Sequence, residues 1–365
     1  MAQRYQKEII EEVPEVDAVL GTTSYGDIVK ALEEAVAGNH FEEFRDIDYL
    51  PDTGSKRVLT TGGHFGYLKI AEGCDKHCTY CIIPKLRGRF RSVPMERLVA
   101  QAEDMAEQGV KELILVAQET TVYGRDLYGE KSLHILLKKL CEIRGIRWIR
   151  ILYCYPEEIY DELIETIRDE KKICHYLDIP IQHASDRILK RMGRRTSKQE
   201  LIDIVGKLRK EIPDIVLRTT LITGFPGETE EDHEELKEFV DEMEFDRLGV
   251  FTYSPEENTP AAEMADQVPE EVKEERRDEL MELQQEISYD RGQDRIGQEL
   301  LVMIEGKVAD ESAYIGRTYG DAPKVDGYIF VQTGELLMTG DFAKVRVTGA
   351  LEYDLIGVLS DEYTE

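Results

Sequence analysis

The stretch "FGYLKIAEGCDKHCTYC", residues 65–81, joins an apolar run to three closely spaced cysteines. The run predicts a buried strand over 66–71, and Cys74, Cys78 and Cys81 follow it with C-x3-C-x2-C spacing. Similar apolar runs recur, with helical patterns between them, at 111–117, 147–153, 176–181, 214–222 and 247–253. Six β-α repeats predict an α/β fold whose parallel sheet curls into a partial (β/α)6 TIM-like barrel. Chemistry in such folds collects at the carboxyl ends of the strands, where we expect the cysteines.

Three neighbouring cysteines leave several kinds of site open. A structural zinc ion needs four ligands, and a catalytic zinc ion held by three thiolates would be unusual. A 4Fe–4S cluster is usually held by four cysteine thiolates, so three cysteines would leave one iron free for a substrate or cofactor. The spacing favours such an open cluster, with a zinc site and unliganded redox thiols as alternatives.

Length and charge narrow the class of protein. The chain has 365 residues, six cysteines and a formal net charge of −29. No apolar run reaches 18 residues, and the charged start "MAQRYQKEIIEE" is unlike a secretory signal, so we expect a cytoplasmic protein with reduced thiols and no membrane contact. The electrostatic field of a negatively charged protein repels nucleic acids and attracts basic proteins, although a role in general solubility explains the charge equally well.

Changes of pattern along the chain predict four segments. Residues 1–45 read as a fragment of an α/β domain, and 46–62 read as a linker because they carry turn residues and little periodicity. Residues 63–294 hold the six repeats and a long charged helix near 270–292. Residues 295–365 contain short β-like runs punctuated by glycine and aspartate, which predict a small antiparallel β-barrel.

The cysteine spacing directly after a first strand resembles the radical S-adenosylmethionine (SAM) superfamily. Tyr80 fits this resemblance, because that superfamily has an aromatic residue just before the third cysteine. The resemblance implies that Cys74, Cys78 and Cys81 hold a 4Fe–4S cluster whose open iron binds SAM. It also implies that one electron cleaves SAM to methionine and a 5′-deoxyadenosyl radical, with the protein supplying orientation.

Longer stretches, "YLDIPIQHASDRILKRMGR" and "RTTLITGFPGETEEDHEEL" among them, resemble the methylthiotransferases over essentially the whole chain. This family inserts sulfur into an unactivated C–H bond and methylates it, and its C-terminal β segment is a TRAM domain. One branch modifies a tRNA adenosine, and the other modifies the β-carbon of an aspartate in small-subunit ribosomal protein S twelve. The stretch "GRTYGDAPKVDGYIFV", residues 316–331, is similar to the second branch.

The charge of the C-terminal module agrees with the second branch. From Arg295 to Glu365 it has six Lys and Arg against thirteen Asp and Glu, a net charge of −7. A tRNA-binding barrel should be basic, whereas an acidic one suits a basic ribosomal protein, so we expect no tRNA partner. An electron donor such as flavodoxin or ferredoxin is also implied. The non-enzymatic alternative is an acidic assembly factor with a structural metal loop.

The chain departs from the family pattern at its start. Family members carry an N-terminal domain whose three further cysteines hold a second 4Fe–4S cluster, but no cysteine precedes Cys74 here. We therefore expect residues 1–45 to be the remnant of a truncated N-terminal methylthiotransferase domain. Cys141, Cys154 and Cys174 are scattered and are expected to be small buried hydrophobic residues.

Five further residues are predicted to contact SAM or substrate: Gln118, Gln182, Gly224 and Tyr253 at strand ends, and Arg218 within a strand. Gln118 and Gln182 follow predicted strands and offer polar contacts, and Arg218 offers a positive charge to the SAM carboxylate. Gly224 lies in "GFPGET", which lacks the phosphate-loop pattern but allows close approach to adenosine. The alternatives are that Gln118 only ends its strand, that Gln182 belongs to a turn network, and that Arg218 forms an internal ion pair. Gly224 would then be part of a plain strand-to-helix turn, and Tyr253 would pack at the barrel rim. No catalytic residue is assigned.

Overall fold

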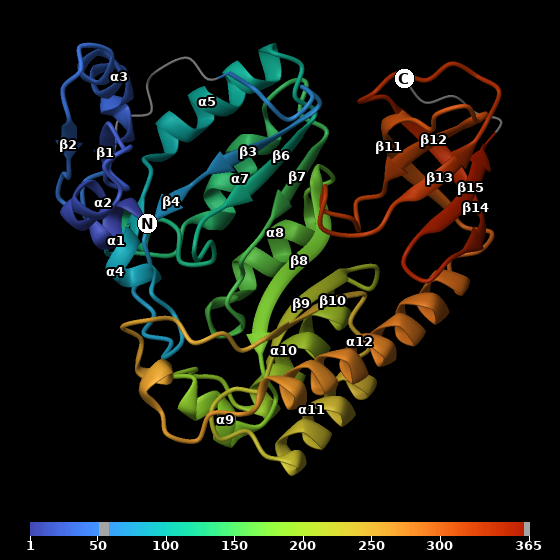
Figure 1. The fold of residues 1–365 in the computed structure, drawn as a ribbon. Helices are drawn as coiled ribbons and strands as arrows, with labels where there is room; N and C mark the ends of the chain where they lie inside the picture. Colours follow the sequence, from blue (N-terminus) through green and yellow to red (C-terminus); the bar gives the residue numbers. More distant parts are fainter. Residues whose placement is uncertain (51–57, 361–365) are drawn as a thin grey trace.

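The predicted parallel sheet is confirmed. The computed structural model describes residues 1–50 and 58–360, and its central sheet has the strand order β3-β6-β7-β8-β9-β10 (Figure 1). Every neighbouring pair is parallel, so the sheet is an open six-stranded part of a barrel. The strands are β3 (Phe65–Lys69), β6 (Glu112–Val116), β7 (Trp148–Ile151), β8 (Ile173–Gln182), β9 (Val216–Thr223) and β10 (Arg247–Thr252).

Helices connect the strands and bury their apolar stripes against the sheet. In α5, for example, Leu98, Ala102 and Met105 lie three or four residues apart and are buried in the main core. Capping boxes begin α10 at Ser197 and α11 at Thr229. The helices after β3 are α4 (Ile83–Arg87), α5 (Met95–Glu107), α6 (Arg125–Tyr128), α7 (Leu133–Cys141), α8 (Asp161–Asp169), α9 (Asp186–Arg191), α10 (Lys198–Glu211), α11 (Glu230–Met243) and α12 (Glu270–Gln293), and short 3-10 turns are η2 (Pro156–Glu158) and η3 (Pro260–Glu263).

The C-terminal segment forms the predicted small barrel, with one difference. Its closed order is β11-β12-β13-β15-β14, and all pairs are antiparallel except β13 and β15, which are parallel. A closed ring with an odd number of strands cannot have every neighbour antiparallel, so one parallel pair is required. The strands are β11 (Glu299–Lys307), β12 (Ala313–Arg317), β13 (Ile329–Gln332), β14 (Phe342–Ala350) and β15 (Leu355–Leu359).

The small barrel packs against the amino ends of the parallel strands. Trp148, the first residue of β7, meets Phe342 edge to face with ring centroids 4.8 Å apart. Tyr176 of β8 and Val216 of β9 join the same buried cluster. Contacts of this kind leave the carboxyl ends of the strands, at the other edge of the sheet, free of the small barrel.

The N-terminal residues form a separate small α/β unit (Figure 1). It consists of α1 (Ala2–Tyr5), α2 (Lys7–Glu12), β1 (Ala18–Leu20), η1 (Tyr25–Asp27), α3 (Ile28–Val36) and β2 (Phe41–Glu43), with β1 and β2 parallel. It contacts the core where the Thr22 hydroxyl donates to the Leu86 carbonyl at 2.8 Å. Within the predicted linker 46–62, residues 51–57 lie outside the described residues, and the four domain boundaries stay predictions.

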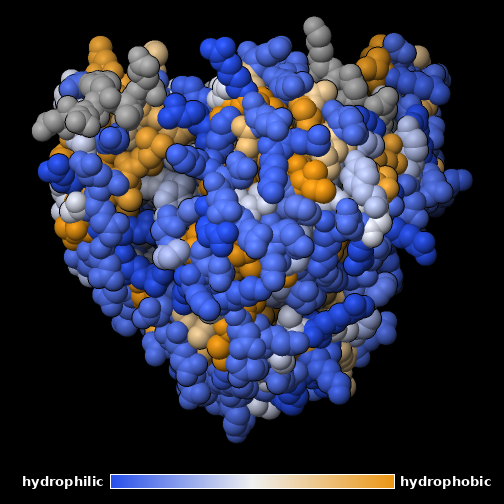
Figure 2. Space-filling model, turned by 180° about the vertical axis from the view of Figure 1, so that it is seen from behind, coloured by the Kyte–Doolittle hydropathy of each residue, from blue (hydrophilic) through white to orange (hydrophobic). Residues whose placement is uncertain are grey.

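The surface is largely polar. The face in Figure 2 is mostly hydrophilic, and its hydrophobic residues form separate patches. Within residues 1–50 and 58–360, no helix combines the length and the hydropathy needed to span a membrane.

Candidate functional site at the carboxyl edge of the sheet

Most predicted site residues lie along the carboxyl edge of the sheet. Gln182 is the last residue of β8, and Gly224 and Tyr253 directly follow β9 and β10. Gln118 lies two residues after β6, and the cysteine loop follows β3. Because the strands are parallel neighbours, their carboxyl ends meet at one edge. The tertiary structure thus gathers segments that are up to 180 residues apart.

The cysteine loop is closed at its base by two short strands, β4 (Ala71–Glu72) and β5 (Arg91–Ser92). The Cys74 amide donates to the Gly88 carbonyl at 3.1 Å, which fixes the start of the loop. Gly73 has φ +79°, and a side chain there would overlap the carbonyl oxygen of Arg89. Only glycine therefore allows the chain to enter the loop in this form.

All three loop cysteines are free thiols, and Cys74 and Cys78 are buried while Cys81 is partly exposed. Burial raises the pKa of Cys74 to about 11, and the charges of Cys78 and Cys81 also raise it. A bound metal reverses this preference, because its positive charge favours the thiolate. Among the described residues, no three His, Cys, Asp or Glu side chains are arranged so that they could hold a metal ion. The ligand set Cys74, Cys78 and Cys81 therefore stays a prediction.

Tyr80 links the cysteine loop to the far strands of the sheet. Its ring packs edge to face on Phe225, 6.4 Å between centroids, and Phe225 packs on Tyr253 at 5.3 Å. Phe225 and Tyr253 belong to one buried cluster, against which Tyr80 packs. These aromatic contacts bring together the segments after β3, β9 and β10, so three of the predicted cofactor-binding segments are neighbours.

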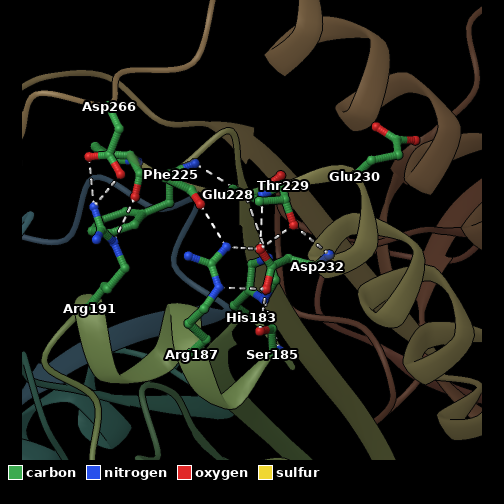
Figure 3. Close-up of polar contacts among 12 residues, drawn as sticks. His183, Ser185, Arg187, Arg191, Phe225, Glu228, Thr229, Glu230, Asp232 and Asp266 are labelled. Atoms are coloured by element: carbon green, nitrogen blue, oxygen red, sulfur yellow. Dashed lines mark hydrogen bonds and ion pairs between the residues drawn. The ribbon is translucent and has the colours of Figure 1, made fainter.

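The turn after β9 is braced by its own chain. Gly224 has φ +68°, and a side chain there would collide with that of Lys273. Lys273 thus fills the space that the missing side chain leaves, which gives this glycine a packing role independent of adenosine. The Glu228 carboxylate accepts from the Phe225 amide at 3.1 Å and from Arg276 Nη1 at 3.0 Å, and Figure 3 shows the first of these bonds closing the turn.

A polar network supports this turn from α9. The Ser185 hydroxyl donates to Asp232 at 2.7 Å, and Arg187 also binds Asp232 (Figure 3). His183 is fully buried, and its Nε2 lies 3.5 Å from a Glu228 oxygen while its Nδ1 accepts from the Ser185 amide at 3.0 Å. His183 therefore belongs to the polar network of this turn.

Several buried polar atoms at this edge have no hydrogen-bond partner among the described residues. They are Gln118 Oε1, Glu119 Oε2, the Tyr253 hydroxyl, and Nε and Nη1 of Arg194. Buried polar groups are almost always hydrogen-bonded, so each of these atoms indicates a place where a water molecule or a ligand can complete the bonding. Together with the three thiols, these donors and acceptors fit an iron–sulfur cluster and a polar cofactor such as SAM.

Glu119 and Arg194 were missed by the sequence reasoning. Burial raises the pKa of Glu119 to about 7, against hydrogen bonds from Thr121. The only sequence signal for Glu119 was its place beside Gln118 in "AQET". Arg194 lies in the charged stretch "LKRMGRRTS", where nothing distinguishes a buried arginine from its exposed neighbours.

Two strand ends carry backbone that is unusual for their residues. Gln182 ends β8 with φ +74°, and Tyr153, two residues after β7, has φ +60°. Left-handed conformations at residues other than glycine cost of order 1–3 kcal/mol and concentrate at functional sites. Contact of Gln182 with cofactor or substrate stays a prediction.

Arg218 is separated from the other predicted residues. It is the third residue of β9, and the six residues to Gly224 span about 20 Å of strand. Its Nη1 binds Asp178 at 2.7 Å, and its Nε lies 3.4 Å from Asp326 of the C-terminal segment. The geometry thus favours the internal ion pair over the SAM carboxylate for Arg218.

The other three cysteines and the basic residues after the cysteine loop have contacts that explain them without a ligand. Cys154 and Cys174 are buried, as predicted, and Cys141 on α7 is partly buried. In the run after the cysteines, Lys85 donates to the Asn258 carbonyl at 2.7 Å, and Arg91 lies 3.3 Å from Asp48. These contacts brace the loop.

The chain is similar to known protein families in two parts. The radical SAM superfamily matches residues 68–240, and the TRAM domain matches residues 296–359. A solved structure described as coproporphyrinogen III oxidase (HemN) from Escherichia coli, a radical SAM enzyme, has a TM-score of 0.49 at 17% identity, covering 78% of this chain and 66% of that one. The first match covers most of the parallel sheet, and the second covers the small C-terminal barrel.

Curated relatives identify the family. A protein named "Ribosomal protein uS12 methylthiotransferase RimO" from Lachnoclostridium phytofermentans is 65% identical over 357 residues, which are 98% of this chain and 81% of that protein. A protein of the same name from Clostridium perfringens is 51% identical over 364 residues, 99% of this chain and 81% of that protein. The chain belongs to the RimO family of methylthiotransferases.

Proposed function

We propose that this chain adds a methylthio group to the β-carbon of an aspartate in small-subunit ribosomal protein uS12. The observation that carries the proposal is the three-cysteine loop at the carboxyl edge of the six-stranded sheet that matches the radical SAM superfamily. The chain is also 65% identical to a curated protein named "Ribosomal protein uS12 methylthiotransferase RimO". The acidic surface supports a basic protein substrate, since opposite charge speeds encounter.

In this proposal Cys74, Cys78 and Cys81 supply three thiolates to one 4Fe–4S cluster. When bound, the cluster supplies the electron that cleaves SAM to methionine and a 5′-deoxyadenosyl radical. Tyr80 and Phe225 exclude water beside the loop, because their rings are packed together between the cysteines and the turn after β9. Gln118 and Gln182 orient the cofactor through polar contacts, and Tyr253 lines the mouth.

The remaining cysteines do not offer a second cluster site in this fold. Cys141 ends α7, Cys154 follows β7, and Cys174 lies near the start of β8. Each sits in a different element, and two are buried, so they supply no trio of thiols at one place. We therefore propose that this chain, as a polypeptide with six cysteines, binds one cluster.

The first experiment tests the cluster and the cleavage of SAM. Anaerobically reconstituted protein should contain about four irons per chain and release 5′-deoxyadenosine on reduction. Cys78→Ser should lose both, while Cys141→Ser, which changes a cysteine on α7, should keep both. Retention of SAM cleavage by Cys78→Ser would refute the ligand assignment. A colourless protein with one zinc would instead favour the acidic assembly factor.

The second experiment tests the macromolecular substrate. Binding to purified uS12 and to tRNA should be compared at two salt concentrations, because nucleic-acid binding falls steeply with salt. We expect measurable binding to uS12 and none to tRNA at physiological salt. Tighter binding to tRNA would favour the tRNA adenosine branch. Reduction assays with flavodoxin and ferredoxin would identify which class of electron donor the enzyme accepts.

A further inference from the structure

Arg218 faces the inside of the partial barrel. Leu217 and Leu221 of β9 are buried in the core between the sheet and the helices. Because side chains alternate along a strand, Arg218 and Thr220 lie on the other face, which is the inside of the barrel. The guanidinium leans toward the carboxyl edge, since its Nη1 lies 3.3 Å from the Thr220 hydroxyl, two residues nearer that edge. From Thr220 to Gly224 about 13 Å of strand remain, which leaves room for a substrate side chain between the guanidinium and the mouth.

The neighbouring strand leaves a gap beside this guanidinium. Gly249 of β10 is the register partner of Thr220. A side chain added at Gly249 would lie 3.8 Å from Arg218 Nη2 and 3.9 Å from the ring of Phe251. Val250, between them, is buried in the main core, so Gly249 and Phe251 face the inside of the barrel, where 60% of Phe251 is exposed. The absence of a side chain at Gly249 thus opens an approach to Nη2 along an aromatic wall.

Two hydrogen-bond donors at this gap are not used by the protein. Asp178 binds Nη1 of Arg218 at 2.7 Å, and Asp326 lies 3.4 Å from Nε. Within residues 1–50 and 58–360 no group accepts from Nη2, and 17% of the arginine side chain is exposed. The Thr220 hydroxyl accepts from Nη1, so its own proton can be donated elsewhere. An arginine N–H and a hydroxyl are therefore available together at an accessible place.

The internal carboxylates leave this cation able to bind a further anion. Asp326 is the more distant partner, and its Oδ2 already accepts from the Tyr176 hydroxyl and the Ala322 amide, both at 2.8 Å. Burial raises the pKa of Asp326 above its ordinary value, although Arg247 and Arg218 act to lower it, so burial disfavours its negative charge. A guanidinium with a free N–H binds a carboxylate through strong, charge-assisted hydrogen bonds.

We propose that Arg218 Nη2 and the Thr220 hydroxyl bind the side-chain carboxylate of the substrate aspartate, which enters past Gly249 and along Phe251. The inference rests on the proposed function, because it needs an aspartate as the residue that is modified. This contact holds the carboxylate deep in the barrel and turns the adjacent β-carbon toward the mouth and the cysteine loop. An asparagine brings no negative charge to the guanidinium, so the same contact selects aspartate.

The test compares two forms of purified uS12, one natural and one with the target aspartate changed to asparagine. Equilibrium binding of each form to the reconstituted full chain is measured with SAM and without reductant. Wild type should bind the aspartate form about tenfold more tightly. Gly249→Val fills the approach and leaves the ion pair with Asp178 intact, so it should bind the two forms equally. Gly306→Val is the matched control and should keep the preference, because Gly306 lies in β11 with nothing near its missing side chain.

A second variant removes the cation together with the carboxylate that it serves. Arg218→Gln combined with Asp178→Asn leaves no unpaired charge between these two strands, and it should also bind both forms of uS12 equally. Arg218→Lys keeps the positive charge and should retain part of the preference. Thermal unfolding of every variant checks the fold, and Gly249→Val decides alone if the double variant does not fold.

The outcomes separate the inference from the proposed function. Loss of the preference in folded Gly249→Val, with SAM affinity unchanged, supports the inference. Equal binding of the two uS12 forms to wild type overturns it and leaves the proposed function standing. A preference that persists in folded Gly249→Val also overturns it, as does a loss of SAM affinity in that variant, which would make the gap part of the SAM site. Binding of neither form by wild type counts against the proposed function, and the inference falls with it.

Discussion

Arg317 of the small barrel donates to Glu112 at the start of β6 over 2.7 Å, and both side chains are fully buried. Arg150 of β7 binds the other oxygen of Glu112 at 2.8 Å, so one carboxylate serves two guanidinium groups. Although burial acts to raise it, the pKa of Glu112 is lowered by Arg150 and Arg317. This buried triad joins the two barrels at the edge opposite the cysteine loop.

Neutralising the centre of the triad should destabilise the protein. Glu112→Gln leaves the buried Arg150 without a carboxylate, whereas Arg317 keeps its ion pair with Glu305 at 2.6 Å. We expect a loss of about 3–5 kcal/mol in the free energy of unfolding, measured by urea denaturation. The control is Glu299→Gln, which breaks an exposed pair with Arg346 and should cost less than about 1 kcal/mol. Equal small losses in the two variants would contradict the role of the triad.

Glu119 should make the apo-protein less stable as pH rises. Burial raises its pKa to about 7 in the fold, against an ordinary value near 4.5, so the native state binds more protons than the unfolded state between these values. The contribution of Glu119 to the free energy of unfolding should therefore be most favourable below about pH 4.5. It should fall by roughly 3 kcal/mol as pH rises to 7.

Comparing Glu119→Gln with wild type isolates this effect. The stability difference between the two apo-proteins, from denaturation at several pH values, should grow in favour of the variant as pH rises from 4.5 to 7. Asp126→Asn, an exposed control whose carboxylate accepts a hydrogen bond from Ser92, should not show this rise. A difference that stays flat with pH would mean that Glu119 ionises normally.

Gly193 should be required for cluster assembly. A methyl group at residue 193 would press on the His77 carbonyl at 2.8 Å in a left-handed backbone, so Gly193→Ala should displace the loop and lower the iron content per chain. Gly206→Ala is the matched control, because Gly206 lies in α10 with nothing near its missing side chain. That control should bind iron normally and be slightly more stable, by about 0.5–1 kcal/mol. Normal iron content in Gly193→Ala would disprove the close packing.

Arg218→Met separates two roles for this residue. The ion pair with Asp178 predicts a loss of roughly 3 kcal/mol in unfolding free energy, because a buried carboxylate loses its partner. SAM affinity of the reconstituted protein should change little, since Arg218 lies about 20 Å along β9 from Gly224. Calorimetric SAM binding checks this, and a large loss of affinity with normal stability would restore the carboxylate role.

Local patterns were enough to predict the sheet and its functional edge. Each parallel strand is a short apolar run, so the six runs and their order could be read directly, and the turn positions placed Gln118, Gln182, Gly224 and Tyr253 at strand ends. The parallel β13–β15 pair was missed, because alternation within a strand carries no information about the direction of its neighbour. The ion-pair partners of Arg218 could not be read either: its charge was visible in the sequence, but Asp178 and Asp326 were not identifiable as partners.

The linear order of residues was sufficient for the cysteine spacing, the β-α alternation and the family, since all of these depend on neighbours along the chain. The linear order was not sufficient to predict the ion pairs between charged side chains that become buried on folding. Glu112 and Arg317 are 205 residues apart, and Arg194 differs from Arg195 only in burial. Burial sets the cost of an unpaired charge, and burial arises only when distant segments pack together.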